Sequence, residues 1–338
     1  LNDYQDEFQA AGLNTSIKWY QVPGNHDYFW MGLFPPDDYL NEAVIGNTPL
    51  NMGNVLIDPL RLKSRGYYMG TIDGRTPYGD VIGAGPVRDF PDGPPKVPAD
   101  PDRRFVSRTE WIAEFFNSTS YPAGHGFSRD SVSSGFACYS FEPRSDIPIR
   151  VIVLDDTQMD DELRNSSYGR GSLDRERFSW LVNELERGQA EGKLMIIAAH
   201  IPVGIELPEE GFDSLMTWDA EAEVSDMELI ATLHRYPNLI LWVSGHRHLN
   251  TITALKSPDP DRPELGFWEV ETASLREFPQ QFRMFDIVRN NDNTVSIFTT
   301  NVDPSVSEGS PAEKSRTYAI AANQLFNLTT DPLTGGAY

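Results

Sequence analysis

The chain has 338 residues, 39% of them hydrophobic, and this length can bury a sizeable core as one large α/β domain or two ordinary ones. Fifty acidic residues against 28 basic ones give a formal net charge of −22, which argues against nucleic acid polymers and anionic membranes as partners, because polyanion binding relies on lysine and arginine. The single cysteine, Cys138, excludes an intramolecular disulfide and cysteine-based zinc sites.

The first apolar run, residues 17–22, predicts a strand, and Gly24-Asn25-His26-Asp27 follows it directly. An amide, an imidazole and a carboxylate then stand side by side at the expected strand end, an arrangement used for chemistry more often than for packing. The structural alternatives are that Asn25 is a plain turn amide and that Asp27 caps the next segment.

Residues 28–145 are rich in glycine, proline and aromatic residues, and carry the residue types of turns. A stretch of this size without regular structure is uncommon inside a compact domain, so we expect an insertion over the active site that selects the substrate. It contains a strand-like piece at 66–72 and a helix-like piece at 107–116. His125, between two glycines, is interpreted as a turn residue rather than a substrate contact.

Regular α/β alternation resumes at residues 149–156, a near-continuous apolar strand that predicts burial on both faces. Asp155 and Asp156 end this strand near the expected cleft. We expect both to be solvated at the sheet edge, and the alternative is that they support the metal ligands through hydrogen bonds. Apolar residues at helical spacing then predict a helix over residues 171–185, with Ser172 as its N-cap.

Two further strand patterns end in histidine. One is the apolar run before His200, and the other covers residues 239–248 and carries His246 and His248. If the second segment is extended, its alternation places both imidazoles on one face and Arg247 on the opposite face. That geometry suits two neighbouring metal ions.

The ends of neighbouring strands in an open α/β sheet meet at the edge where ligands bind. Three such ends would bring together one amide and four imidazoles, those of Asn25, His26, His200, His246 and His248, and this predicts a metal site. The structural alternatives are a satisfied core histidine at position 200 and an exposed turn pair at positions 246 and 248.

Three consecutive strands are predicted after this point, over residues 267–272, 282–288 and 294–299, with polar turns between them. Consecutive strands joined by such turns predict an antiparallel meander. With the preceding α/β alternation, the expected fold is α/β, a mixed β-sandwich flanked by helices.

In this order, Gly-Asn-His-Asp, a strand-terminal histidine and Gly-His-Arg-His resemble the calcineurin-like metallophosphoesterase superfamily, on its purple-acid-phosphatase and cyclic-nucleotide-phosphodiesterase side. The resemblance implies that Asn25, His200 and His246 bind one metal ion and His248 the other. It also implies that His26 assists the leaving group and that Asp27 orients His26.

The chain departs from that family in two motifs, because it has no Asp-x-His and no Gly-Asp-x-x-Asp/Asn. Gly79-Asp80 continues differently and is interpreted as a loop pair. We therefore expect a single metallophosphoesterase domain over residues 1–338, N-terminally incomplete, in which residues 28–145 form the insertion. The full-length protein would hold two divalent ions of Mn, Fe, Zn or Co, and this chain one or none.

The function implied by the resemblance is metal-dependent hydrolysis of phosphomonoesters or phosphodiesters by a water that two metal ions activate. The expected partner is a small phosphate ester, since bound cations can invert the sign of an acidic site. The alternative is a non-catalytic, metal-poor relative that binds a ligand or a protein. Neither the compartment nor the oligomeric state is indicated by the sequence.

Overall fold

A computed structural model describes residues 12–29, 99–159, 169–204, 218–276 and 279–329, together with a few isolated positions between 32 and 80. The chain packs as two compact units. The first comprises Leu1–Tyr20 and His26–Phe136, and the second Gln21–Asn25 and Ala137–Tyr338. The predicted strand-like piece at 66–72 lies outside the described residues.

The first unit contains short helices and one small hairpin. Ser107 accepts from the backbone of Glu110 and opens α3, as the helical pattern at 107–116 predicts. The described elements are β1 (Arg75–Thr76), β2 (Gly79–Asp80), η3 (Pro101–Arg103), α3 (Arg108–Glu114), η4 (Ala123–Gly126) and α4 (Arg129–Ser134). The interpretation of Gly79-Asp80 as a loop pair is wrong, because this pair forms β2 and is antiparallel to β1.

The strand predicted over residues 17–22 is also not formed. Within the first unit, Lys18 makes an isolated bridge to Tyr121, and the amide of Trp19 donates to the Tyr121 carbonyl at 3.2 Å. One bridge is not a ladder, so an apolar run alone did not specify a strand here.

The second unit is built on a mixed sheet in which six described strands take part. The four central strands are parallel to one another, and one antiparallel strand lies at each edge. In sheet order the strands are β3 (Tyr139–Phe141), β4 (Ile149–Val153), β5 (Leu194–Ala198), β6 (Leu239–Ser244), β8 (Phe267–Glu271) and β7 (Thr251–Leu255).

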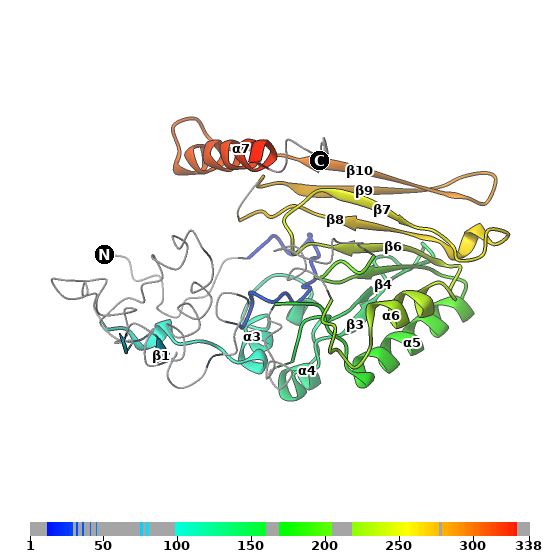
Figure 1. Cartoon of the computed structure of the whole chain (residues 1–338), viewed down its shortest axis with the longest axis horizontal. Coiled ribbons are helices and arrows are strands. Elements are labelled where there is room, and N and C mark those ends of the chain that lie inside the picture. Colours follow the sequence, from blue (N-terminus) through cyan, green and yellow to red (C-terminus); the bar gives the residue numbers. More distant parts are fainter. Residues whose placement is uncertain are drawn as a thin grey trace. The chain divides into compact units, whose positions relative to one another are not determined.

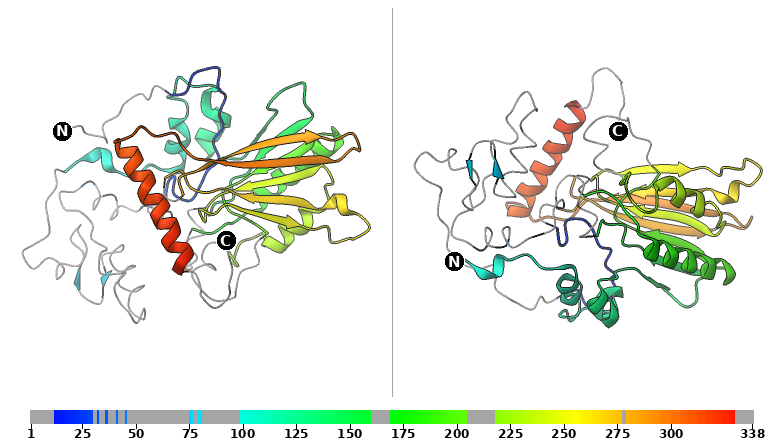
Figure 2. Two further views of the ribbon diagram at one scale, coloured as in Figure 1. Left: turned by 90° about the horizontal axis from the view of Figure 1, so that it is seen from above. Right: turned by 60° about the horizontal axis from the view of Figure 1, so that its bottom comes forward.

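Helices α5 (Arg175–Ala190) and α6 (Asp226–Leu233) lie on one side of this sheet (Figure 1, Figure 2). The central strands carry fully buried side chains, among them Ile152 and Ile197. The N-cap of α5 is Asp174, whose side chain accepts from the amide of Arg177, so the predicted N-cap at Ser172 is wrong by two residues.

Strands β9 (Phe282–Arg289) and β10 (Val295–Val302) form a separate antiparallel hairpin, which Figure 1 shows beyond β7 and β8 on the side away from α5 and α6. The predicted three-stranded meander is therefore only half right. Strand β8 instead joins the main sheet parallel to β6, where it carries buried side chains at four of its five positions. Helix α7 (Pro311–Thr329), which the sequence analysis did not predict, follows β10.

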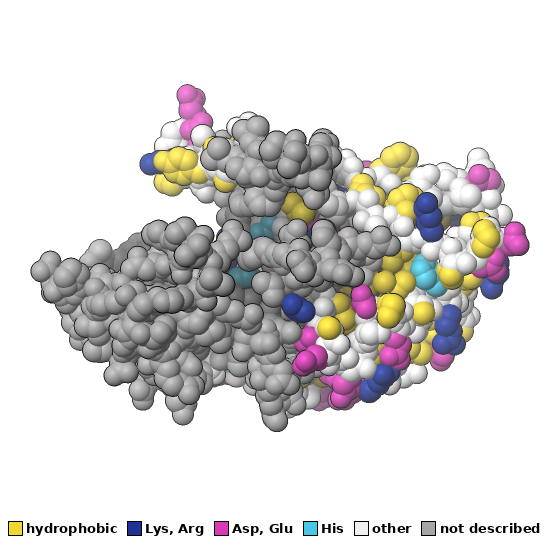
Figure 3. All heavy atoms as spheres, viewed as in Figure 1, with side chains coloured by type: hydrophobic (Ala, Val, Ile, Leu, Met, Phe, Trp, Pro, Cys, Tyr) yellow, Lys and Arg dark blue, Asp and Glu magenta, His cyan; other side chains and the backbone are white. Residues whose placement is uncertain are grey.

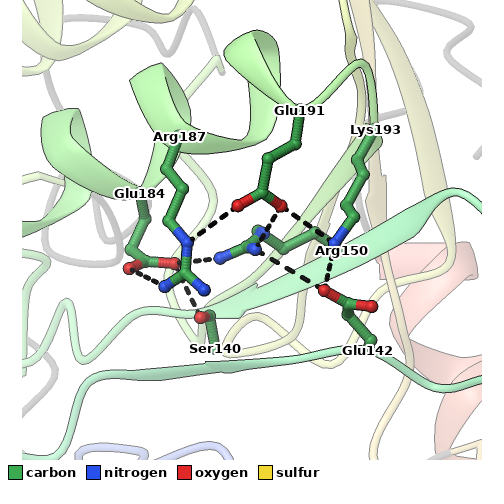
Figure 4. A network of polar contacts seen from close by, with 7 residues as sticks. All are labelled: Ser140, Glu142, Arg150, Glu184, Arg187, Glu191 and Lys193. Carbon is green, nitrogen blue, oxygen red and sulfur yellow. Dashed lines mark hydrogen bonds and ion pairs between the residues drawn. The ribbon is translucent and has the colours of Figure 1, made fainter. Parts of the chain in front are cut away.

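A network of charges ties α5 to the amino-terminal ends of β4 and β5 (Figure 4). The guanidinium of Arg150, whose residue is only 2% exposed, donates to Glu184 and to Glu191, each at 2.8 Å, and lies 3.6 Å from Glu142. Lys193 pairs with Glu142 and with Glu191. One buried cation thus fixes the helix against the sheet.

The surface around α5 carries acidic and basic side chains side by side on the face that Figure 3 shows, rather than a patch of one sign. Across the described part of the chain, we find no helix with the length and apolarity needed to span a membrane.

Candidate metal centre

The loops after β5 and β6 are brought together by the register of the parallel strands. Ala198 pairs with Val243. Ala198 lies two positions before His200, and Val243 lies three positions before His246. Beyond the strand ends, the amide of Ala199 donates to the Val243 carbonyl and that of Gly245 to the His200 carbonyl, each at 3.0 Å. The sheet therefore dictates that His200 and His246 lie side by side.

Three side chains of the second unit converge at this point. Nε2 of His200 lies 2.8 Å from Oδ1 of Asn25 and 3.3 Å from Nδ1 of His246. The two imidazole rings are 5.1 Å apart at an angle of 76°. Asn25 and His246 are buried and His200 is half-buried. The structure thus gathers the three residues that the sequence assigned to one metal ion.

The two distances from Nε2 of His200, 2.8 Å to Oδ1 of Asn25 and 3.3 Å to Nδ1 of His246, are of the size expected between ligands of one cation. Ligand atoms at about 2.1 Å from a metal ion lie roughly 3.0 Å apart in octahedral and roughly 3.4 Å apart in tetrahedral geometry. Two imidazole nitrogens and an amide oxygen suit a borderline divalent ion. Within the described ranges, no group of three or more His, Cys, Asp or Glu side chains could hold a metal ion. The candidate cluster has two histidines, and its third potential ligand is the amide oxygen of Asn25.

Gly24 allows the Asn25 segment to approach His200 closely. A Cβ atom at position 24 would lie 3.1 Å from Cε1 and from Nδ1 of the His200 ring. Such contacts are tighter than ordinary van der Waals packing, so a side chain here would move the imidazole. The glycine of the Gly-Asn-His-Asp motif is therefore explained by its neighbour across the site.

The turn that carries His246 and His248 is not extended, contrary to the prediction. Strand β6 ends at Ser244, and the backbone φ angles of His246 and His248 are 75° and 62°. Left-handed conformations of residues other than glycine are uncommon and carry strain. The alternation argument for two imidazoles on one face is consequently wrong.

Glu271 of β8 holds this turn in place. Its carboxylate accepts from the Arg247 amide at 3.2 Å and from the Arg247 guanidinium at 2.6 Å, and the Thr251 hydroxyl donates to it at 3.1 Å. Burial raises the pKa of Glu271, and the paired Arg247 opposes that rise. Arg247 is thus a structural residue of the turn, which leaves the two flanking histidines as the candidates for chemistry.

The loop after β5 is held in a similar way by two other carboxylates. Asp156 accepts from the amides of His200 and Ile201, and Glu269 accepts from those of Val203 and Gly204. Burial raises the pKa of Asp156 to about 8 and that of Glu269 to about 7.

Asp155 and Asp156 are both fully buried, so the expectation that they are solvated at the sheet edge is wrong. Their surroundings differ. Asp155 accepts from the amide and the hydroxyl of Thr157, at 3.1 and 2.6 Å, whereas Asp156 faces the His200 loop. The two adjacent carboxylates therefore bind different segments, Asp155 its own turn and Asp156 the loop of His200.

The other predicted site residues, His26, Asp27 and His248, are not part of the cluster of Asn25, His200 and His246. His26 is exposed and Asp27 half-exposed in the turn after Asn25, and both belong to the first unit, whereas Asn25 belongs to the second. Their roles stay predictions. His248 is half-exposed and does not form a three-ligand group with His200 and His246.

His125, which the sequence analysis interprets as a turn residue, packs inside the first unit. His125 is fully buried in a turn of the first unit, where its ring stacks on Trp19 with a 3.4 Å centroid distance. Burial lowers its pKa.

Comparisons with known proteins give little further support. No protein-family model and no curated protein matches the chain. Among solved structures, it is similar to a dimetal phosphatase from Danio rerio, with 13% sequence identity and a TM-score of 0.35, over 53% of this chain and 64% of that one. The chain therefore spans less than two thirds of that protein's length, and a likeness at this level does not decide a family or an activity.

Proposed function

We propose that the protein is a metal-dependent hydrolase of phosphoric esters, either phosphomonoesters or phosphodiesters, and that its fold is a metallophosphoesterase-like β-sandwich flanked by helices. The observation that carries the proposal is the convergence of Asn25, His200 and His246, with donor atoms 2.8 and 3.3 Å apart. These residues come from three segments that are distant in the sequence, as the three-motif pattern requires.

The assignment of residues follows from the same cluster. Asn25, His200 and His246 would hold one divalent ion of Mn, Fe, Zn or Co, and His248 would contribute to a second. The missing Asp-x-His and Gly-Asp-x-x-Asp/Asn motifs leave that second position with one ligand from this chain. We include in the proposal a single domain over residues 1–338, with residues 28–145 as an insertion that selects the substrate.

Divalent cations at such a site supply a water activated at neutral pH and neutralise the charge of a phosphate ester. Within this chain, Asn25, His200 and His246 would hold the cation in place. His26 protonates the departing alkoxide, and Asp27 fixes its tautomer. The net charge of −22 favours a small ester over a nucleic acid polymer or an anionic membrane.

A second candidate of another class is a metal-poor ligand- or protein-binding relative without catalysis. It is favoured by the absence of the Asp-x-His and Gly-Asp-x-x-Asp/Asn motifs from this chain, which leaves the second metal position with His248 as its one assigned ligand. Intact copies of the two absent motifs upstream in the gene would exclude it.

Metal content and hydrolysis, measured together on the full chain, test the proposal. After exposure to Mn²⁺, Fe²⁺ or Zn²⁺ and desalting, we expect up to one equivalent of metal by elemental analysis, and cleavage of p-nitrophenyl phosphate or its bis-ester. His246→Gln should lose both. His234→Gln is the matched control, because His234 caps α6, where its Nδ1 lies 2.8 Å from the Leu265 carbonyl.

Each result has a distinct meaning. If the chain and His246→Gln retain equally little metal, the cluster is not a metal centre and the proposal fails. Metal retention that depends on His246, without hydrolysis of either ester, would favour the binding-protein alternative.

A further inference from the structure

We propose that Asp156 is a positioning residue for the metal centre, which fixes the His200 imidazole by binding the backbone of the loop that carries it, and that Glu269 holds the far end of the same loop. This inference rests on the proposed function. We call these two carboxylates the loop clamp.

Asp156 uses both of its carboxylate oxygens on the ligand segment. Oδ1 accepts from the amide of His200 at 3.0 Å, and Oδ2 accepts from the amide of Ile201 at 2.9 Å. The residue is 0% exposed. Two bonds to consecutive amides define both the place and the rotation of the peptide plane, and therefore the direction in which the His200 side chain leaves the backbone.

Asp156 is itself held rigidly, so it can transmit position. Its carbonyl accepts from the Ser172 amide at 2.8 Å. The buried guanidinium of Arg177, from α5, donates to the carbonyls on either side, at 3.0 Å to Asp155 and 2.6 Å to Thr157. The order of support therefore runs from helix α5 through the end of β4 to the His200 loop.

Glu269 secures the other end of this loop from β8. Its two oxygens accept from the amides of Val203 and Gly204, at 2.6 and 3.0 Å. Between the two carboxylates, the Ile201 carbonyl accepts from the indole of Trp242 at 3.3 Å. With the His200 carbonyl, which accepts from the Gly245 amide, four amides and two carbonyls of this five-residue loop are thus hydrogen-bonded to other segments.

A merely stabilising role does not explain this arrangement. A buried carboxylate carries a desolvation cost, and apolar replacements for buried charges are often neutral or stabilising. Both carboxylates of the loop clamp spend their oxygens on the backbone of one loop, and that loop carries a residue of the three-ligand cluster. Groups that hydrogen-bond to metal-ligating side chains typically change metal affinity 10- to 100-fold when they are altered, and we expect an effect at the lower end of this range from a carboxylate that acts through the backbone.

The test compares two adjacent aspartates of equal burial. Asp156→Asn keeps the shape of the side chain but replaces one acceptor by a donor, which opposes an amide N–H of the loop. Asp155→Asn is the matched control, since Asp155 is equally buried but accepts from Thr157. Both variants are expected to lower the melting temperature.

Cobalt is the probe, because Co²⁺ gives a visible absorption spectrum that reports its ligand geometry. Titrated into the full chain, Asp156→Asn should bind Co²⁺ at least about tenfold more weakly and with an altered spectrum. Asp155→Asn should bind within about threefold of the unaltered protein and with its spectrum. Glu269→Gln, which acts farther from the ligand, should fall between them.

The inference fails if folded Asp156→Asn binds Co²⁺ like the unaltered protein, or if Asp155→Asn weakens binding as much. If the unaltered chain binds no Co²⁺, the proposed function is what fails. In that case the ¹⁵N chemical shifts of the His200 ring, assigned with His200→Gln, still decide the positioning role in the metal-free protein. They should change in Asp156→Asn and not in Asp155→Asn, and equal shifts in all three proteins would overturn it.

Discussion

The two ends of strand β4 carry buried charge in opposite ways. At its beginning, Arg150 is surrounded by Glu184, Glu191 and Glu142, so that cation and anions meet side chain to side chain. Directly after its end, Asp156 is equally buried but gives its oxygens to backbone amides of another loop. The first arrangement joins a helix to a sheet, and the second fixes the conformation of a loop.

The difference indicates that the amino-terminal edge of this sheet contributes stability, whereas the carboxyl-terminal edge fixes the conformation of the loops that carry the candidate site. Charges that neutralise each other at the amino-terminal edge lose much of their desolvation cost through pairing. The carboxylates at the carboxyl-terminal edge have fewer cationic partners, and burial raises the pKa of Asp156, Glu269 and Glu271. We therefore expect the buried carboxylates at that edge to lower the stability of the fold while they fix the geometry of the loops.

The largest effect is expected from Arg150→Met. Removing the cation leaves Glu184, whose side chain is 14% exposed, with the Ser140 hydroxyl and the surface side chain of Arg187 in place of its buried partner. Breaking a buried pair costs about 3–5 kcal/mol. Urea unfolding should show this loss, while Co²⁺ binding by the folded protein stays unchanged. Arg187→Met is the control, because that side chain is 59% exposed and should cost less than about 1 kcal/mol. A loss of similar size in both variants would remove the distinction between a buried and a surface charge.

The pH dependence of stability should isolate Glu269. Because burial raises its pKa from 4.5 to about 7, the folded state binds its proton more tightly than the unfolded state. The stability this group contributes is fully present below pH 4.5 and is lost as the pH rises through about 7. The shift corresponds to at most about 3 kcal/mol.

The measurement is the free energy of unfolding of the metal-free chain from pH 4.5 to 8, with Glu269→Gln beside it. Asp156 acts in the same direction, up to about pH 8, in both proteins. The difference between the two proteins should therefore change only through the titration of Glu269. A constant difference across this range would show that Glu269 keeps an ordinary pKa.

The smallest effect is expected from Gly24→Ala. The added Cβ would lie 3.1 Å from two atoms of the His200 ring and should displace it by a few tenths of an ångström. We expect about fivefold weaker Co²⁺ binding, or about 1 kcal/mol, with little change in the melting temperature. Gly245→Ala is the matched control, since its nearest contact, Nδ1 of His200, lies at an ordinary 3.8 Å. Equal affinities in the two variants would contradict the close-approach argument.

That His200 and His246 lie together could be predicted from sequence because the signal is local, whereas the ligand set, which includes Asn25, came from the resemblance and stays a prediction. A run of apolar residues before His200 and before His246 fixes a parallel strand in each case, and parallel neighbours end at one edge. The α/β class follows from the same alternation. The strand predicted over residues 17–22 failed, because a short apolar run does not say whether a ladder partner is available.

The residues that hold the two loops of the candidate cluster gave a weaker signal, because a supporting role for Asp155 and Asp156 was only the alternative to solvation. An aspartate after a strand, or a glutamate within one, is read as solvated unless the partners of its oxygens are known. For Asp156 and Glu269 those partners are backbone amides more than 40 positions away in the chain. The alternation of Glu269 and Glu271 in a strand otherwise made of Phe, Trp and Val was the one available clue, since charged residues at buried-strand spacing need partners.

The left-handed backbone at His246 and His248 limits which residues could replace the two histidines in the proposed metal site without disturbing the turn. Asn, Asp and His are the residues most enriched in that conformation after glycine, and each of them also offers a metal-binding atom. Exchange of imidazole for a harder oxygen ligand by Asp or Asn should therefore leave the backbone undisturbed. Cys or Glu at the same positions would change the ligand and add strain to the turn.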